Sequence, residues 1–407
     1  MKIRSITCFY DPGAPNSPQV LRQVAELARQ ASRRFQSAGY PVETTRLATV
    51  PFSQVLRTMT PEAAVEHAVD MQTKAGQNGF TFVSLGPALA CQPESYELVN
   101  PMLAETKIAF LSGEIATAQE GVVLLATKAC GKIISQASTV TVDGFTNLRF
   151  AALANVKPFS PFFPAAFSEG PQPAFALAIE CADLALAIFQ DVRSLASARK
   201  RLIQTLEAQG RTLAAIAEDI SNTFEVEFKG IDFSLAPYPQ AWCSLGSALE
   251  HLGPVKLGLS GSLAAAAFLA DALDQGKWKR TGLNGLVMPV LEDATLAERS
   301  AGGGLSINDL LLYSAVCGAG LDTVPLPGNA TPDQLSAVLV DVAALSSRLG
   351  RPLIARLMPI PGKKTGEDIH FNFDYFSDGR VMDLPAAPLH GPLGGNESFH
   401  LTPWHPA

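Results

Sequence analysis

The sequence predicts an α/β protein in which strands and helices alternate along almost the whole chain. Segments rich in β-branched and aromatic residues are followed by segments whose apolar residues recur at steps of three and four, and turn residues separate the two kinds. The chain has 407 residues, of which 47% are hydrophobic and only 17% charged. This composition suits a large buried core and excludes a mostly disordered chain.

The N-terminal part of the chain shows the alternation clearly. Asp11-Pro12-Gly13 is a strong turn signal after a β-branched and aromatic run, and Gly39 is placed to end the helix that follows. Pro61 after Thr60 is typical of a helix start. The predicted elements are a strand at 3–10, a helix at 18–38, a strand at 41–49, a helix at 61–76 and a strand at 80–85.

The alternation continues through the rest of the chain. The longest apolar stretch, residues 174–189, predicts a buried amphipathic helix, and two helical patterns cover 174–208. Ser306 is a predicted helix cap, with Asp309 three residues later. The remaining predicted strands are 139–142, 149–154, 226–234, 255–259, 285–291 and 352–359, and the remaining helices are 210–223, 262–273, 306–317 and 332–349.

Charge and cysteine content restrict the classes of partner. The net charge is −7 and no long basic run exists, which argues against nucleic acid and an anionic membrane surface as partners. Glu180 and Asp183 interrupt the longest apolar stretch, which is too short to span a bilayer. The N-terminus lacks an apolar signal-like region, and six scattered cysteines form no paired motif, so a cytoplasmic protein with reduced thiols is expected.

The domain organisation predicted from the sequence is simple. Residues 1–383 form one large α/β domain, and residues 384–407 form an irregular tail rich in Pro and Gly. The high apolar fraction also fits a homo-oligomer, because apolar surface patches would be buried between copies.

Acidic residues at predicted strand ends are the first candidates for chemistry. Glu292 and Asp293 follow the strand 285–291, where a carboxylate can act as a general base or bind a hard metal ion. Asp293 equally fits the cap of the helix that follows. Asp322 and Thr323 follow a glycine-rich loop after Cys317, which is either a nucleophile or a wall thiol.

Other segments supply candidates for binding an anion. Asp232 and Ser234 share one face of the strand 226–234, and Arg356 inside a strand requires a carboxylate partner from protein or ligand. A helix start at Ser260–Ser262 and a loop with Lys363 favour anions; a simple cap and a solvated turn explain them as well. The predicted catalytic residues are Asp232, Glu292, Cys317 and Asp322, and the predicted substrate-binding residues are Ser234, Ser260, Ser262, Thr323, Arg356 and Lys363.

Five segments resemble a bacterial and archaeal family catalogued as domain of unknown function 711. They are MKIRSITCFYDPG at the start, FAALANVKPFSPFFPAAF at 150–167, GIDFSLAP at 230–237, GLNGLVMPVLEDATLAER at 282–299 and LLLYSAVCGAGLDTVPLPG at 310–328. The resemblance extends to about Met382. It implies a ten-stranded β/α barrel related to pyruvate formate-lyase and other glycyl radical enzymes, and it implies no established activity.

Radical catalysis does not follow from this resemblance. Glycyl radical enzymes need a glycine two residues after an Arg-Val pair near the C-terminus, and here Arg380-Val381 precede Met382 and Asp383. Cys317 is followed by Gly318, so the adjacent cysteine pair of pyruvate formate-lyase is missing. What the resemblance preserves is the barrel, in which a central loop could present Cys317 to a small acid.

We therefore expect a lyase, isomerase or hydrolase that acts on a small anionic metabolite by carboxylate acid–base chemistry. A metal-dependent version would use Asp232, Glu292, Asp293 and Asp322 as oxygen ligands for magnesium or calcium. No motif for another cofactor is present. The alternative is a non-catalytic metabolite-binding or regulatory protein on the same barrel.

Overall fold

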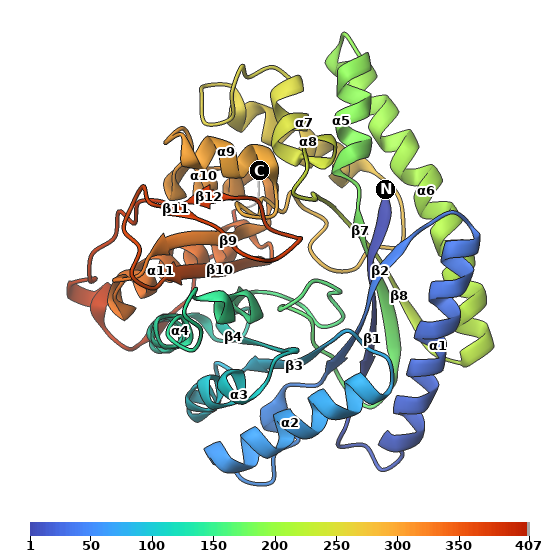
Figure 1. Ribbon diagram of the computed structural model, residues 1–407, viewed down its shortest axis with the longest axis vertical. Helices are drawn as coiled ribbons and strands as arrows, with labels where there is room; N and C mark the ends of the chain where they lie inside the picture. The colour runs from blue at the N-terminus through green and yellow to red at the C-terminus, as the bar shows by residue number, and fades with distance from the viewer. Residues whose placement is uncertain (405–407) are drawn as a thin grey trace.

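A computed structural model describes residues 1–404 and contains an α/β protein built on a large, mixed and mostly parallel sheet (Figure 1). The path of this sheet runs in the order β8-β7-β1-β2-β3-β4-β6-β10-β9, and two short strands lie off the path. Helices lie around the outside of the strands in Figure 1. This arrangement confirms the α/β class predicted from the alternation.

The first half of the sheet is a block of five parallel strands. They are β1 (Lys2–Tyr10), β2 (Val42–Thr49), β3 (Phe82–Ala88), β4 (Ala109–Thr117) and β6 (Phe150–Ala154). The helices that connect them are α1 (Ser17–Ser37), α2 (Pro61–Gln77), α3 (Val99–Glu105) and α4 (Leu124–Ala137).

The second half runs in the opposite direction. It contains the parallel pairs β7–β8 and β9–β10, and it meets the first half through the antiparallel pairs β1–β7 and β6–β10. Its strands are β7 (Ala174–Glu180), β8 (Glu227–Ala236), β9 (Gly320–Pro327) and β10 (Leu353–Ile360). Its helices are α5 (Ala182–Asp191), α6 (Leu195–Phe224), α7 (Leu245–His251), α8 (Ser262–Gln275), α9 (Ala294–Ala301), α10 (Ile307–Cys317) and α11 (Pro332–Leu349).

One extended segment contacts both edge strands of the sheet. Isolated parallel bridges join Ile231 of β8 to Arg280 and Asp322 of β9 to Pro289. Val287 N also donates to Ser234 O at 3.4 Å, and Val290 N donates to Asp322 O at 3.0 Å. Residues 280–291 therefore lie between β8 and β9, parallel to both.

Short elements cover the ends of the sheet. The tail returns to the sheet, because β13 (Ser398–Phe399) pairs with β5 (Gly121–Val123), which pairs with β4. A small hairpin of β11 (Asp368–Ile369) and β12 (Gly379–Arg380) forms a separate sheet. Short 3-10 turns lie at Phe52–Gln54, Pro93–Leu98, Phe145–Arg149, Ala241–Cys243 and Gly391–Gly394.

Most predicted elements agree with the structure. The helix predicted at 306–317 is α10, where Ser306 and Asp309 form a capping box. The strand predicted at 41–49 is β2, and the helix predicted at 332–349 is α11. None of the helices within residues 1–404 has the length and apolar character that a bilayer span requires.

Three predicted elements were wrong in type or extent. Residues 174–180, predicted as helix, form β7, because a strand with paired neighbours and two covered faces is apolar throughout and has no alternation. Residues 255–259, predicted as a strand, form turns with Val255 84% exposed. The helix predicted to begin at Gly210 is the second half of the continuous α6.

Two further predicted strands lack regular strand structure. Residues 139–142 form turns, and Val142 is 96% exposed, so no sheet neighbour is available to pair with them. Residues 285–291 are extended but only bridge their neighbours at isolated points, as described above. The prediction was correct about the position of this segment and wrong about its regularity.

The sheet has a different apolar cluster on each of its two faces. On β1, Ile6, Cys8 and Tyr10 belong to the large apolar core that includes α1, whereas Phe9 belongs to a smaller cluster on the other face. That smaller cluster includes Phe163 from the loop after β6. The sheet therefore has an outer face covered by helices and an inner face that packs against a loop.

The loop after β6 occupies this inner face, and residues 157–168 are called the interior segment below. Figure 1 shows this green loop near the middle of the molecule, between β4 and β7. Strand hydroxyls bind its backbone: Thr7 Oγ1 donates to Pro161 O at 3.3 Å, and Ser84 Oγ donates to Ala166 O at 2.6 Å. These bonds explain why buried strand positions on the inner face carry hydroxyls.

Candidate functional site

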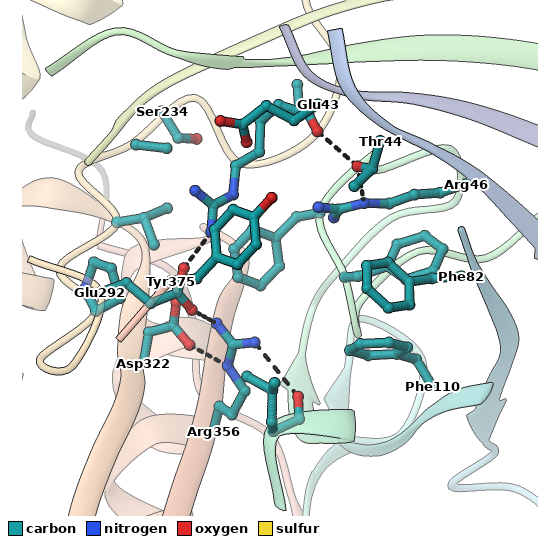
Figure 2. Close-up of a pocket in the computed structure, with 18 of the residues that line it drawn as sticks. Glu43, Thr44, Arg46, Phe82, Phe110, Ser234, Glu292, Asp322, Arg356 and Tyr375 are labelled. Carbon is teal, nitrogen blue, oxygen red and sulfur yellow. Dashed lines mark hydrogen bonds and ion pairs between the residues drawn. The ribbon is translucent and has the colours of Figure 1, made fainter. Parts of the chain in front are cut away.

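A cavity of about 140 Å³ lies on the inner face of the sheet (Figure 2). Strands from both halves line it, together with Phe162 and Phe163 of the interior segment and with Phe373 and Tyr375 of the β11–β12 hairpin. Asp232, Glu292 and Asp322, which are far apart in the sequence, all line this cavity. The structure therefore brings together the three acidic residues expected to act in acid–base chemistry.

Ion pairs link Arg4, Glu292, Arg356 and Asp322 into a chain along one wall. Figure 2 shows the ion pairs of Arg356 with Glu292 and Asp322 as dashed lines. Arg356 Nη2 lies 2.8 Å from Glu292 Oε1, and Arg356 Nε lies 2.5 Å from Asp322 Oδ1. Arg4 contacts Glu292 Oε2. Because Glu292, Arg356 and Asp322 are all buried, each charge depends on its partners for compensation.

Arg4 reaches the cavity because of an irregularity in β1. The register of β1 against β7 shifts between Ile3 and Ser5, and such a shift resets which side chains point to each face. Arg4 also lies 3.3 Å from Glu180 Oε2, and its guanidinium carbon lies 5.6 Å from the ring centre of Tyr375. The N-terminal strand thereby adds a cation to the ion-pair chain.

Asp322 is held through only one of its two carboxylate oxygens. Its Oδ1 binds Arg356, whereas its Oδ2 is buried and has no hydrogen-bond partner within the described residues. Burial raises the pKa of this carboxyl and Glu292 raises it further, although Arg356 lowers it. Asp322 lines the cavity, and a carboxyl with a raised pKa and an unpartnered oxygen is suited to accept or donate a proton.

Arg46 on β2 is a cation that lacks a carboxylate partner in the part of the chain that is described. Its Nε donates to Thr44 Oγ1 at 3.0 Å, and Figure 2 shows its terminal nitrogens directed towards Tyr375. Its guanidinium carbon lies 5.9 Å from the ring centre of Phe82 and 5.2 Å from that of Phe163. Burial, and then the neighbouring cation Arg4, lower the pKa of Arg46 to about 9.

Asp232 lines the cavity but its oxygens are already occupied. Leu283 N donates to Oδ2 at 2.9 Å and Asn284 N donates to Oδ1 at 3.1 Å, and the Ser234 hydroxyl donates to Oδ1 as well. Burial raises the pKa of this carboxyl, and these hydrogen bonds oppose the rise. Asp232 and Ser234 therefore hold the extended segment 280–291 against β8.

The four carboxylates expected to bind magnesium or calcium do not form one ligand set. Within residues 1–404 there is no group of three or more His, Cys, Asp or Glu side chains arranged to hold a metal ion. Asp293 points away to cap α9, accepting from Thr295 N and Leu296 N, and it also accepts from Ser244 and Gly246. This capping is one of the two roles that the sequence allowed for Asp293.

The remaining sequence candidates lie outside the cavity lining. Cys317 is buried at the end of α10, where its thiol donates to Leu286 O at 3.6 Å and burial raises its pKa to about 12. Thr323 Oγ1 accepts from Leu291 N at 3.3 Å. Ser262 begins α8 and binds its own loop, while Ser260 and Lys363 are exposed.

A second hollow of about 910 Å³ is lined by residues from both ends of the interior segment, Lys157 and Pro158 at one end and Phe167 at the other. Its two arginines are already bound, because Arg351 pairs with Asp274 and Arg280 donates to carbonyl oxygens at the end of α8. Its Lys157 and Glu169 are exposed to solvent. The smaller cavity, which contains an unpaired cation and a free carboxylate oxygen, is the stronger candidate for a functional site.

Sequence reasoning missed Arg4, Arg46 and the aromatic walls. An Arg inside an apolar strand was used as a signal for Arg356, and the same signal applies to Arg4 in IRSITCFY and to Arg46 in TTRLAT. No sequence pattern predicts the clustering of Phe82, Phe110 and Phe163, because these rings come from separate elements.

The pH dependence of stability is expected to reflect the titration of the Glu180 carboxyl. This carboxyl lies beside Arg4 and Lys2, and the carboxylates of Glu43 and Asp183 also act on it. Burial, with a contribution from Glu43, raises the pKa of Glu180 to about 7, although Arg4 and Lys2 lower it. The folded protein then holds a proton that the unfolded chain loses near pH 4.5, so this group's contribution falls as the pH rises to about 7.

Replacing Glu180 by Gln should remove that loss. The stability of Glu180→Gln relative to the native protein should increase by about 3 kcal/mol between pH 4.5 and pH 8, as measured by urea unfolding. The exposed Glu97→Gln serves as a control that leaves the pH profile unchanged. A constant difference across the pH range would show that Glu180 is ionised throughout.

The fold and the cavity define a class: an α/β protein with a buried chain of ion pairs beside an aromatic-walled cavity. The family model described as Uncharacterised ACR (DUF711) matches residues 1–374. The chain belongs to this family, which confirms the resemblance drawn from its five segments.

Curated relatives carry the name UPF0210 protein. The one from Pyrobaculum islandicum is 30% identical over 92% of this chain and 87% of its own length. The relative from Pyrobaculum arsenaticum is 29% identical over 87% of this chain and 83% of its own length. The relative from Halothermothrix orenii is 28% identical over 90% of this chain and 84% of its own length. The similarity therefore extends over nearly the whole chain.

Proposed function

We propose that the protein is an enzyme that acts on a small anionic metabolite by acid–base chemistry in the aromatic-walled cavity. The observation that carries this proposal is the pairing of two incomplete groups in one cavity. Arg46 is a half-buried cation that forms no ion pair within residues 1–404, and Asp322 has a buried oxygen without a partner in that range. A bound anion would compensate the first group and present a proton to the second.

The surroundings of Asp322 support its role as the acid or base. Its raised pKa brings the proton-transfer range closer to neutral pH than that of an exposed carboxyl. Arg356 holds Oδ1 and thereby directs Oδ2, while Glu292 and Arg4 hold Arg356 in place. Apolar walls limit water in the cavity and strengthen each electrostatic contact with the ligand.

We also propose that the sheet closes into a ten-stranded barrel related to that of pyruvate formate-lyase. The support is topological: residues 280–291 contact β8 and β9, which are the two ends of the sheet path. With that segment the two halves each contain five parallel strands, and the halves run antiparallel to one another. Radical chemistry remains outside the proposal, because the sequence lacks the radical glycine and Cys317 does not line the cavity.

A second candidate function is ligand binding without turnover. It is favoured by the ion pairs, because both oxygens of Glu292 and one oxygen of Asp322 are already bound to arginines. In this case the cavity would sense a metabolite and the anion would stabilise the folded state by mass action.

Turnover is tested by incubating the protein with mixtures of small organic and phosphorylated acids and following the mixture by NMR. We expect one acid to be converted, and Asp322→Asn should lower the rate by about 100-fold or more, the range for a lost acid or base. The variant should fold, since its amide oxygen still accepts from Arg356.

The matched control is Asp368→Asn, which alters an exposed ion pair with Arg380 and should leave turnover unchanged. Conversion that is unaffected in Asp322→Asn would contradict the assigned role. Binding of an acid without any conversion would favour the second candidate.

A further inference from the structure

Charge compensation around the cavity limits the ligand to one negative charge. Arg4 and Arg356 each contact two carboxylates, and Lys2 lies 3.1 Å from Glu43. Arg4 and Arg356 are therefore already compensated. The cations of the cavity lining that form no ion pair within residues 1–404 are Arg46, Lys107 and Arg149.

Two of these three cations are not placed to bind a ligand in the cavity, so a second negative charge on the ligand would be uncompensated. Arg149 is turned towards the end of α3, where it donates to Leu103 O at 2.7 Å and to Ala109 O at 3.1 Å. Lys107 is on the rim and exposed, so water screens its charge. Arg46 is thus the cation that can accept an anion inside the cavity.

The walls beside Arg46 are aromatic and closely packed. The ring centres of Phe82 and Phe110 are 5.2 Å apart, and those of Phe110 and Phe163 are 5.4 Å apart, in edge-on pairs. The guanidinium of Arg46 lies beside Phe82 and Phe163, as given above. A flat apolar group fits such walls better than a hydrated chain.

The size of the cavity also suits a single ring. Its volume of about 140 Å³ is close to the roughly 150 Å³ of apolar cavities that accept benzene. Arg46 lies on β2 and Asp322 on β9, and β3, β4, β6 and β10 lie between these strands in the sheet. A ligand that reaches both groups therefore carries its anion and its reacting group at different ends.

We propose that the ligand is a monocarboxylate whose body is one planar ring, with a hydroxyl or carbonyl group at the end away from the carboxylate. The carboxylate binds Arg46, the ring lies against Phe82, Phe110 and Phe163, and the distal group meets Asp322. This inference rests on the proposed function, because it assumes that Arg46 binds the anion.

The test measures binding of a matched set of acids to the full-length protein by calorimetry at constant ionic strength. The probes are 4-hydroxybenzoate, benzoate, cyclohexanecarboxylate, acetate, succinate and inorganic phosphate. We expect 4-hydroxybenzoate and benzoate to bind at least about tenfold more tightly than acetate, succinate or phosphate, with cyclohexanecarboxylate in between. Arg46→Met should weaken benzoate binding by about tenfold or more.

Controls separate the cation from the ring contacts. Arg57→Met changes an exposed arginine outside the cavity lining and should leave affinity unchanged. Phe82→Leu should weaken benzoate and leave acetate nearly unaffected. Arg46→Met should keep a normal melting temperature, because it removes a half-buried cation that has no ion-pair partner in the described chain.

The outcomes distinguish this inference from the proposed function. Tight binding of succinate or phosphate with weak binding of benzoate would overturn the inference that the ligand is a monocarboxylate with a ring. The proposal of an enzyme that acts on a small anion would remain intact. Equal affinity for benzoate and acetate would also overturn it. If no acid binds and Arg46→Met has no effect, both fail together.

Discussion

Replacing Arg356 by Met is expected to destabilise the protein by about 3–5 kcal/mol, the range for removing one partner of a buried ion pair. Arg356 is 4% exposed and compensates both Glu292 and Asp322, which are 6% and 2% exposed. Without it, two buried carboxylates would have to become protonated or draw water into the cavity. Denaturant unfolding at neutral pH would measure the loss.

A matched surface change provides the control for this prediction. Arg380→Met removes an arginine that pairs with Asp368, but both side chains are about half or more exposed, so the cost should be below about 1 kcal/mol. Adding Asp322→Asn to Arg356→Met should recover part of the loss, since the uncompensated charge is then removed. A loss no larger than that of Arg380→Met would show that the ion-pair chain contributes little.

Replacing Gly320 by Ala is expected to cost about 3 kcal/mol or more, because it combines an unfavourable backbone angle with a clash. Gly320 begins β9 with φ +97°. A Cβ there would contact Ile354 O and would lie 2.7 Å from Ile354 N. Ile354 belongs to the adjacent strand β10 and pairs with Gly320, so its backbone cannot move without disrupting the sheet.

Gly362→Ala separates the two contributions. Gly362 also has a positive φ, +75°, but no atom lies within 4 Å of the position of a Cβ. It should therefore cost only about 1 kcal/mol, the penalty of the backbone angle alone. Equal losses in the two variants, measured by thermal or urea unfolding, would rule out close strand packing as the reason for Gly320.

These two predictions concern the same part of the site. Asp322 is two residues after Gly320 on β9, and Arg356 is two residues after Ile354 on β10. Gly320 pairs with Ile354 just before the register of the two strands shifts, and Asp322 and Arg356 lie at this shift. Stability and the geometry of the proposed acid–base group are therefore coupled, and a variant that disturbs the strand pair should impair both.

Local sequence was sufficient for the elements that local energetics determine. The helix predicted at 332–349 agrees with α11 because Thr331 and Gln334 form a capping box and Gly350 adopts a left-handed angle at its end. The turn at Asp11-Pro12-Gly13 and the strand before it also follow from neighbouring residues alone. In the same way the carboxylates after strand segments directed attention to Glu292 and Asp322.

Long-range contacts decided the rest. Residues 174–180 have an apolar pattern that fits a helix as well as a strand, and pairing with β1 and β8 selects the strand. The predicted base Asp232 proved to be saturated by backbone N–H groups of residues 283 and 284, which are about 50 positions away in sequence. No local pattern could show this, because hydrogen-bond partners of a buried carboxylate depend on the fold.

By itself the sequence determined the α/β class, most helix ends and the family, since these depend on periodicity, capping residues and segments that are contiguous in the chain. Only the tertiary structure decided which charges are compensated. Arg46 and Arg356 have similar strand contexts in the sequence, but Arg356 meets two carboxylates and Arg46 faces a cavity beside phenylalanine rings. Electrostatic compensation acts between atoms a few ångströms apart in space, whatever their separation along the chain.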